Sequence, residues 1–314
     1  MLTDTPVVAL TGATGFIGGC IARHLVTTGW RVRVLVRQGS EGRLPNLPLE
    51  VCLGNIEQSA SLERLLEGAQ AIVHCAGVVR GISQSDFDRV NASGTERLAR
   101  LSARHGIGRF VLISSLAARA PQLSPYAMSK KRGEQILYDL DDRLSWVILR
   151  PPAVYGPGDR EMKPLLKAMV RGLVPVIGDR DARFSLIYVD DLARAALAAL
   201  TASGVSQRLF ELDDGHRGGY SWQEVIDIAS SYRNRPVYAV SVPEILLRAM
   251  AAISLLASRL GGRSPMLTPA KVNELRHPDW VCDNNDICAA LNWQPQVSFA
   301  KGLALTLAND QPIS

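Results

Sequence analysis

The chain has 314 residues, of which 47% are hydrophobic and 21% charged, and its net charge at pH 7 is +5. This composition is typical of a soluble α/β protein with a substantial core. No run of lysines and arginines concentrates this positive charge. The dispersed charge excludes a nucleic-acid-binding patch. The five cysteines are odd in number and form no Cys-x-x-Cys pair, which predicts a reduced, cytoplasmic protein without a structural metal.

A glycine-rich turn, residues 11–18, follows an expected strand at residues 6–10 and precedes an amphipathic helix. This order is typical of the first unit of a dinucleotide-binding fold. Gly12 permits a tight turn, Gly15 permits close approach of a pyrophosphate, and Gly18 lets the helix lie close to the sheet. The spacing alone also suits a structural turn, but the flanking strand and helix favour cofactor binding. The residues predicted to bind the cofactor here are Gly12, Thr14, Gly15, Phe16, Ile17 and Gly18.

The second expected strand, residues 31–36, is followed by a basic residue, Arg37. In this kind of fold an acidic residue at that place binds the ribose hydroxyls of NAD, whereas a guanidinium pairs with a 2′-phosphate in a charge-assisted fork. Arg37 therefore predicts NADP(H) as the preferred cofactor, with NAD as the alternative. Arg43 is a candidate second partner of the phosphate. A solvated arginine at a strand end is the other interpretation of Arg37.

Strands are expected at residues 49–53 and 71–77, with a helix over residues 59–67 between them. Asn55, in the turn after the third strand, either faces the adenine ring or caps the turn. The fourth strand ends in small residues, so that a cofactor can lie across the sheet there. His74 is interpreted as a packed strand residue, because no second metal ligand lies near it in the sequence. The residues predicted to bind the cofactor in these segments are Asn55, Ile56, Cys75, Ala76 and Gly77.

A long helix expected over residues 86–105 leads to a fifth strand at residues 109–113. Apolar strands thus alternate with amphipathic helices along the first half of the chain. This alternation predicts a parallel sheet covered by helices on both faces, which is the doubly wound α/β arrangement of a Rossmann fold.

Three residues after the fifth strand are candidates for catalysis. Ser115 lies at the strand end, and Tyr126 and Lys130 lie one helical turn apart in the next segment. A lysine there stabilises a tyrosinate and lowers the pKa of Tyr126 toward the range of a general acid/base. Ser115 can hydrogen-bond the substrate oxygen on the carbon that gains or loses a hydride. Tyr-x-x-x-Lys is common by chance, but its place after the strand and the glycine turn makes it specific.

Three further motifs extend this pattern: residues 149–158, 184–193 and 291–295. With the glycine turn, the end of the fourth strand and the candidate catalytic residues, they make the chain resemble the extended short-chain dehydrogenases/reductases. That group includes NAD-dependent epimerases and dehydratases and 3-beta-hydroxysteroid dehydrogenase-like enzymes. The resemblance covers nearly the whole chain.

The resemblance implies that the serine, tyrosine and lysine carry catalysis, and that the tyrosine and lysine also contact the cofactor. It further implies contacts of Pro151 and Val154 with the nicotinamide and an architectural role for Asn91. Two positions depart from the family pattern. Ala153 stands where sugar-nucleotide members typically carry an asparagine, which weakens a nucleotide-sugar substrate. Asn55 stands where the family usually has an aspartate, which weakens the expected adenine contact.

Residues 1–156 and 184–212 are predicted to form the dinucleotide-binding domain, and residues 157–183 and 213–314 a smaller C-terminal substrate lobe. Residues 242–256 are apolar beyond a single helical stripe. We favour a helix packed in the core of that lobe. The alternatives are a wall for a lipophilic substrate, a dimer contact or a membrane-surface contact. No apolar run is long enough to span a bilayer, and we see no secretion signal.

We predict an NADP(H)-preferring oxidoreductase that interconverts a carbonyl and a secondary alcohol on a small, lipophilic substrate, with Tyr126 passing the proton. The alternative chemistry is that of a nucleotide-sugar epimerase or dehydratase with tightly held NAD(P), which shows no net turnover of the cofactor. A cofactor-sensing regulator on the same fold would need no acid/base pair. We also expect a cytoplasmic homodimer without nucleic-acid partners or an integral membrane segment.

Overall fold

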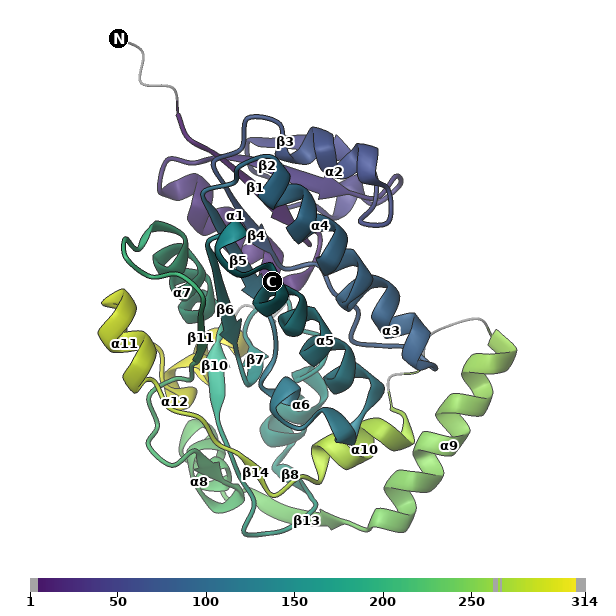
Figure 1. The fold of residues 1–314 in the computed structure, drawn as a ribbon. Coiled ribbons are helices and arrows are strands. Elements are labelled where there is room, and N and C mark those ends of the chain that lie inside the picture. Colours follow the sequence, from purple (N-terminus) through teal and green to yellow (C-terminus); the bar gives the residue numbers. More distant parts are fainter. Residues whose placement is uncertain (1–4, 262–264, 266, 309–314) are drawn as a thin grey trace.

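A seven-stranded parallel sheet forms the centre of the computed structural model, which describes residues 5–261, 265 and 267–308 (Figure 1). The strand order is β11-β6-β5-β4-β1-β2-β3, which confirms the predicted doubly wound Rossmann sheet. The order reverses between β1 and β4, and ligands bind outside the carboxyl ends of the strands at such a point. The strands of this sheet are β1 (Val7–Thr11), β2 (Arg31–Val36), β3 (Leu49–Leu53), β4 (Ala71–His74), β5 (Arg109–Ile113), β6 (Trp146–Arg150) and β11 (Arg208–Glu211).

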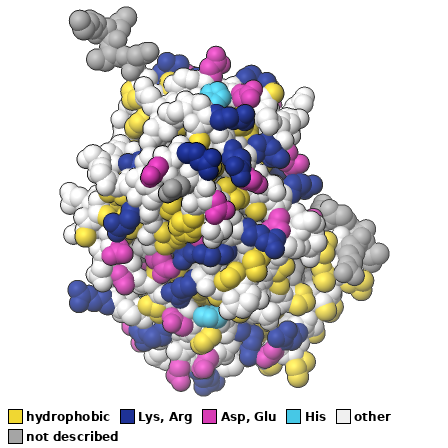
Figure 2. Space-filling view, in the orientation of Figure 1, with side chains coloured by type: hydrophobic (Ala, Val, Ile, Leu, Met, Phe, Trp, Pro, Cys, Tyr) yellow, Lys and Arg dark blue, Asp and Glu magenta, His cyan; other side chains and the backbone are white. Residues whose placement is uncertain are grey.

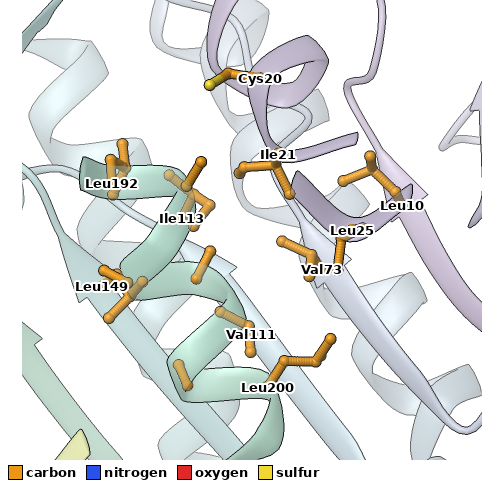
Figure 3. Close-up of a cluster of buried hydrophobic side chains, with 14 of the residues drawn as sticks. Leu10, Cys20, Ile21, Leu25, Val73, Val111, Ile113, Leu149, Leu192 and Leu200 are labelled. Carbon is orange, nitrogen blue, oxygen red and sulfur yellow. The ribbon is translucent and has the colours of Figure 1, made fainter. Parts of the chain in front are cut away.

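Helices cover both faces of the sheet. Helices α1 (Phe16–Thr27) and α7 (Val189–Thr201) pack on one face, and α2 (Ser59–Leu66), α4 (Ser93–Arg104) and α5 (Pro125–Leu140) pack on the other. On the first face, aliphatic side chains of the two helices interdigitate with those of the central strands, as Figure 3 shows. The central strands are mainly apolar because each of their two faces is buried.

The single long helix predicted over residues 86–105 is wrong. The segment forms α3 (Gln84–Asn91), which begins at a capping box on Ser83, and then α4, with a break at Ala92. The Asn91 side chain explains the break, because it accepts a hydrogen bond from the Val78 amide (2.8 Å) and donates to the Val78 carbonyl (2.9 Å). It also donates to the Ser129 hydroxyl at 2.9 Å, so Asn91 ties the loop after β4 to α5.

The remaining strands pair outside the central sheet. Strand β10 (Leu186–Tyr188) pairs with β7 (Ala153–Tyr155), so residues 184–212 return only α7 and β11 to the central sheet. The division into two domains stays a prediction. The other paired strands are β8 (Leu173–Ile177) with β13 (Tyr238–Val242), and β9 (Arg183–Phe184) with β12 (Tyr220–Ser221) and β14 (Asp279–Trp280). The other helices are α6 (Lys163–Arg171), α8 (Trp222–Arg233), α9 (Glu244–Gly261), α10 (Pro269–Leu275), α11 (Asn285–Leu291) and α12 (Phe299–Ala308), with 3₁₀ turns η1 (Glu41–Arg43), η2 (Leu116–Arg119), η3 (Pro121–Leu123) and η4 (Asp141–Arg143).

The two late sequence motifs form one structural unit around a buried carboxylate. Asp191, in the first turn of α7, accepts hydrogen bonds from the amides of Gln296 (2.9 Å) and Val297 (3.0 Å). The Trp293 indole donates to the Asp191 carbonyl at 3.2 Å. These contacts fasten the C-terminal segment to the helix that covers the sheet.

Helix α9 does not pack in a lobe core, which corrects the favoured interpretation of residues 242–256. Only a small cluster holds it, formed by Leu247 and Ala251 with Val272 of α10. Most of its other apolar side chains are exposed. Figure 1 shows why: α9 lies at the periphery of the molecule, beside α10. Among the described residues, no helix is long and apolar enough to cross a membrane.

Candidate active site

A cavity of about 1530 Å³ lies along the carboxyl ends of the central strands. Its walls come from the glycine turn, from the ends of β2 to β5, from the segment after β6 and from the C-terminal part of the chain. The predicted site residues that line it are Gly12, Thr14, Gly15, Phe16, Ile17, Gly18, Arg37, Asn55, Ile56, Cys75, Ala76, Gly77, Ser115, Tyr126 and Val154.

The glycine turn is packed so closely that side chains would not fit. Gly12 has φ +84°, and a Cβ there would come within 2.7 Å of the Ala76 amide nitrogen. A Cβ on Gly18 would come within 2.2 Å of the Gly12 carbonyl oxygen, so Gly18 packs against the turn itself rather than against the sheet. Gly15 is the N-cap of α1 and has no side chain to bond the first amides of the helix. These amides suit a pyrophosphate, so the turn fits a dinucleotide.

Two arginines line the cavity beyond β2. The Ser40 amide donates to the Arg37 carbonyl (2.9 Å) and the Arg43 amide to the Ser40 carbonyl (3.1 Å), which folds the chain so that both arginines reach the same cavity. In the described part of the chain, no carboxylate forms an ion pair with either guanidinium. Asn55 uses its side-chain oxygen to accept a hydrogen bond from the Glu57 amide at 2.8 Å, so it caps its turn while lining the cavity.

His74, at the end of β4, is the packed strand residue that the sequence predicts. Its ring nitrogens lie 2.6 Å from the Thr11 hydroxyl and 3.0 Å from the Thr95 hydroxyl. Burial lowers the pKa of His74 to about 3, and the positive charge of Lys130 contributes to this. The imidazole is therefore neutral and joins β1, β4 and α4.

Ser115 and Tyr126 meet inside the cavity. Ser115 follows β5, and its hydroxyl accepts a hydrogen bond from the Ala117 amide at 3.2 Å. Two short 3₁₀ turns, η2 and η3, then lead to α5, which contains Tyr126 in its first turn. Burial raises the pKa of Tyr126, whereas a hydrogen bond with Ser115 lowers it. The structure thus brings the predicted serine and tyrosine together.

Lys130 lies one turn further along α5, as predicted, and it is partly exposed but is not among the residues that line the cavity. Its ammonium donates to the Ile113 carbonyl at 2.9 Å, and a Cβ added to Gly77 would lie 3.4 Å from it. Burial lowers the pKa of Lys130. Pro151 is also buried outside the cavity lining, where its carbonyl accepts a hydrogen bond from the Leu116 amide at 2.8 Å. Neither residue lines the cavity, unlike Val154.

A buried ion pair holds α5 against the sheet next to these residues. The Glu134 carboxylate accepts two hydrogen bonds from the Arg150 guanidinium, at 2.7 and 2.5 Å. It also accepts one from the Ser114 hydroxyl at 2.6 Å. This network joins α5, the end of β5 and β6, and so sets the position of the tyrosine relative to the serine.

Two charged residues from the C-terminal part of the chain face Tyr126, and no motif in the sequence identifies them. The Lys271 ammonium lies 5.8 Å from the centre of the Tyr126 ring. It pairs with the Glu274 carboxylate at 2.7 Å, and that carboxylate also accepts a hydrogen bond from the Ser124 hydroxyl. The positive charge of Lys271 lowers the pKa of Tyr126, and the negative charge of Glu274 raises it.

Cys20, His24 and Asp190 place three groups of metal-ligand type within 4.8 Å of one another. The His24 ring lies 2.9 Å from the Asp190 carboxylate, and the Cys20 thiol donates to that carboxylate at 3.5 Å. Burial raises the pKa of Cys20 to about 12, so the thiol keeps its proton. These hydrogen bonds join two helices, and we therefore interpret the cluster as a contact between α1 and α7.

The class of protein follows from where these groups lie. A buried tyrosine hydrogen-bonded to a serine, beside a cavity that starts at the glycine turn of a Rossmann sheet, is the arrangement of an NAD(P)-dependent oxidoreductase of the extended short-chain type. Residues 8–212 match the NAD dependent epimerase/dehydratase family, and the chain belongs to this family.

Several known proteins are similar to the chain. It is 38% identical over 283 residues to a ceramide reductase of Caulobacter vibrioides, covering 90% of this chain and 88% of that one. It is 28% identical to a 3 beta-hydroxysteroid dehydrogenase/Delta 5-->4-isomerase of Mycobacterium tuberculosis, covering 88% and 82% of the two chains. The crystal structure of a UDP-glucose 4-epimerase of Thermotoga maritima with UDP-glucose is similar in fold, with a TM-score of 0.75, 21% identity and coverage of 96% and 98%.

Proposed function

We propose that this protein is an NADP(H)-preferring reductase that converts a ketone in a lipophilic, long-chain substrate to a secondary alcohol, and that catalyses the reverse reaction. The observation that carries the proposal is the composition of the cavity around Tyr126. On the cofactor side its lining includes the glycines of the turn with Arg23, Arg37 and Arg43, and on the far side it consists mainly of large apolar side chains. Those side chains are Leu165, Ile177, Phe184, Trp222, Met250 and Leu267.

The residues present fit NADP(H). The first amides of α1 would hold the pyrophosphate, and Arg37 with Arg43 would hold the 2′-phosphate in charge-assisted hydrogen bonds. When bound, the cofactor supplies a hydride to the substrate carbon or accepts one from it. An acidic residue that would favour NAD is missing directly after β2, where the sequence runs Arg37-Gln38-Gly39.

The side chains of the protein transfer the proton and orient the substrate. Tyr126 donates its hydroxyl proton to the carbonyl oxygen during reduction and takes it back during oxidation. Ser115 hydrogen-bonds the same oxygen and holds it beside the tyrosine. Lys271 supplies a positive charge near the tyrosine ring, which stabilises the tyrosinate that remains after the proton has left, and Lys130 is the second candidate for this role.

The apolar far side supports a lipid rather than a nucleotide sugar. Burial of ~200 Å² of hydrocarbon stabilises a complex by about 5 kcal/mol. Ala153 offers no amide for a sugar hydroxyl. The two similar proteins named for a ceramide and a hydroxysteroid act on apolar compounds, which supports the same substrate class here.

Loss of NADPH absorbance in the presence of long-chain ketones tests the proposal. We expect net oxidation of NADPH, faster than that of NADH, and a higher melting temperature with NADP(H) plus a lipophilic ketone than with a UDP- or dTDP-sugar. Conversion of a nucleotide sugar without net cofactor turnover would instead establish the epimerase chemistry. A homodimer, a cytoplasmic location and the catalytic roles above are parts of the same proposal, and light scattering measures the first of them.

A further inference from the structure

The outward side of α9 is an apolar surface. It consists of Ile245, Leu246, Met250, Ile253 and Leu256, whose side chains are between 50% and 85% exposed. We call these five residues the outer face of α9. Figure 2 shows hydrophobic side chains along this edge of the molecule, at the lower right. Single exposed aliphatic residues are ordinary, but five on one helix mark an interaction site.

The outer face is continuous with the opening of the active site. Met250 belongs to the outer face and also lines the large cavity. In the loop after β4, Val79 and Ile82 are exposed as well. Val79 lines the large cavity, and a smaller cavity of about 220 Å³ lies between this loop and Leu255 of α9. Exposed apolar side chains from both α9 and this loop therefore border the cavities.

We infer that the outer face of α9 docks on an anionic phospholipid bilayer, so that a lipid enters the cavity directly from the membrane. An interfacial helix needs only one apolar face, which enters the boundary between headgroups and acyl chains. The inference rests on the proposed function for the kind of molecule that enters, but the docking itself does not depend on turnover.

The size of the surface and the nearby charge favour a bilayer over a second copy of the chain. A stable dimer buries about 800 Å² per partner from roughly 20–30 residues, whereas the outer face offers five side chains of one helix. At the start of α9, the guanidinium groups of Arg248 and Arg276 share the single carboxylate of Glu244, which leaves one positive charge. The chain has a net charge of +5, which also favours an anionic surface.

Co-sedimentation of the full chain with sucrose-loaded vesicles tests the inference. Vesicles of phosphatidylglycerol and phosphatidylcholine should bind the protein more strongly than vesicles of phosphatidylcholine alone. The double variant Ile253→Glu with Leu256→Glu should reduce binding at least about tenfold, because it places two negative charges in the docking face. The matched control is Val51→Glu with Leu53→Glu on β3, whose side chains are each 47% exposed at the far end of the molecule. It adds the same charge and should bind like the wild type.

Three results would overturn the inference: wild-type protein that stays in solution, an α9 variant that binds as well as the wild type, and a control that loses binding equally. If the wild type is a dimer that binds no vesicles and the α9 variant is a monomer by light scattering, the outer face binds a second copy instead. Melting curves measured by circular dichroism show that both variants are folded.

A parallel assay separates this inference from the proposed function. With a short, water-soluble ketone, the α9 variant should oxidise NADPH at the wild-type rate, because Ile253 and Leu256 do not line the cavity. With a long-chain ketone in vesicles its rate should fall. Wild-type protein that binds vesicles but oxidises no NADPH with any ketone would refute the proposed function and leave the docking intact.

Discussion

Replacement of Lys271 by methionine should make Tyr126 harder to ionise. The Lys271 ammonium lies 5.8 Å from the centre of the tyrosine ring, and its charge lowers the pKa of Tyr126. The other groups that act on this pKa are Ser115, which lowers it, and Glu274 and Cys75, which raise it. Removal of the ammonium leaves the Glu274 carboxylate unpaired, and both changes raise the pKa of Tyr126.

The size of the shift follows from the geometry. With the 5.8 Å from the ammonium to the ring centre taken as the scale of the separation, two unit charges interact by about 3 kcal/mol at an effective dielectric constant of ~20. The Lys271 side chain is 40% exposed and its partner carboxylate is 2.7 Å away, so solvent and the carboxylate both reduce this interaction. We expect a net effect of about 1 kcal/mol, which corresponds to a rise of somewhat less than one pH unit.

The pH dependence of kcat/KM for ketone reduction measures this shift. Reduction requires the protonated phenol, so the rate falls as the pH rises through the pKa of Tyr126. In Lys271→Met this fall should move to higher pH, and alcohol oxidation, which requires the tyrosinate, should slow at a given pH. Lys271→Arg keeps the charge and serves as the matched control. An alkaline limb that stays in place or moves to lower pH in Lys271→Met would refute the reasoning.

Three further changes test the site. Tyr126→Phe should abolish NADPH oxidation, because the phenol transfers the proton. Its NADPH affinity, measured by fluorescence titration, should stay within a few fold of the wild type, because the phenol is not needed for folding. Wild-type turnover in this variant would contradict the role of Tyr126. Arg37→Asp should weaken the binding of NADPH by roughly 2 kcal/mol, about 30-fold, because a charge-assisted pair is lost and repulsion is added. The binding of NADH should weaken much less. Equal losses for both cofactors would contradict the 2′-phosphate contact. Glu134→Gln should lower the free energy of unfolding in urea by about 3 kcal/mol, because Arg150 loses its two short contacts with the buried carboxylate and keeps the 3.4 Å contact with Glu211. Glu63→Gln on the exposed side of α2 is the control, and an equal small loss in both would show that the buried pair contributes little.

The sheet and the tyrosine-lysine spacing could be predicted because they depend on neighbours along the chain. Strand-turn-helix order follows from short-range hydrophobic periodicity, and Tyr126 and Lys130 face one way because four residues make about one helical turn. The break at Ala92 could not be predicted in this way. It depends on Asn91, whose partners Val78 and Ser129 come from other segments.

The cavity shows the same division between local and distant contacts. The residues of the glycine turn line it as predicted, because the turn, β1 and α1 are consecutive. Pro151 and Lys130 were expected to contact the cofactor on the strength of family resemblance, and the structure places both outside the lining. Their distance from the lining depends on how β6 and α5 pack against β5, and this packing leaves no pattern in the sequence.

By itself the sequence determined the Rossmann sheet, and it predicted the place of the dinucleotide turn and the candidate serine, tyrosine and lysine, since each is encoded in a short stretch of chain. Only the tertiary structure decided that Lys271 and Glu274 face the tyrosine and that α9 turns its apolar side outward. The apolar pattern of a helix shows how much apolar surface would be stabilised if it were removed from water. Whether that surface is buried depends on which other segments pack against it, and the described segments beside α9 form a small core around Leu247, Ala251 and Val272.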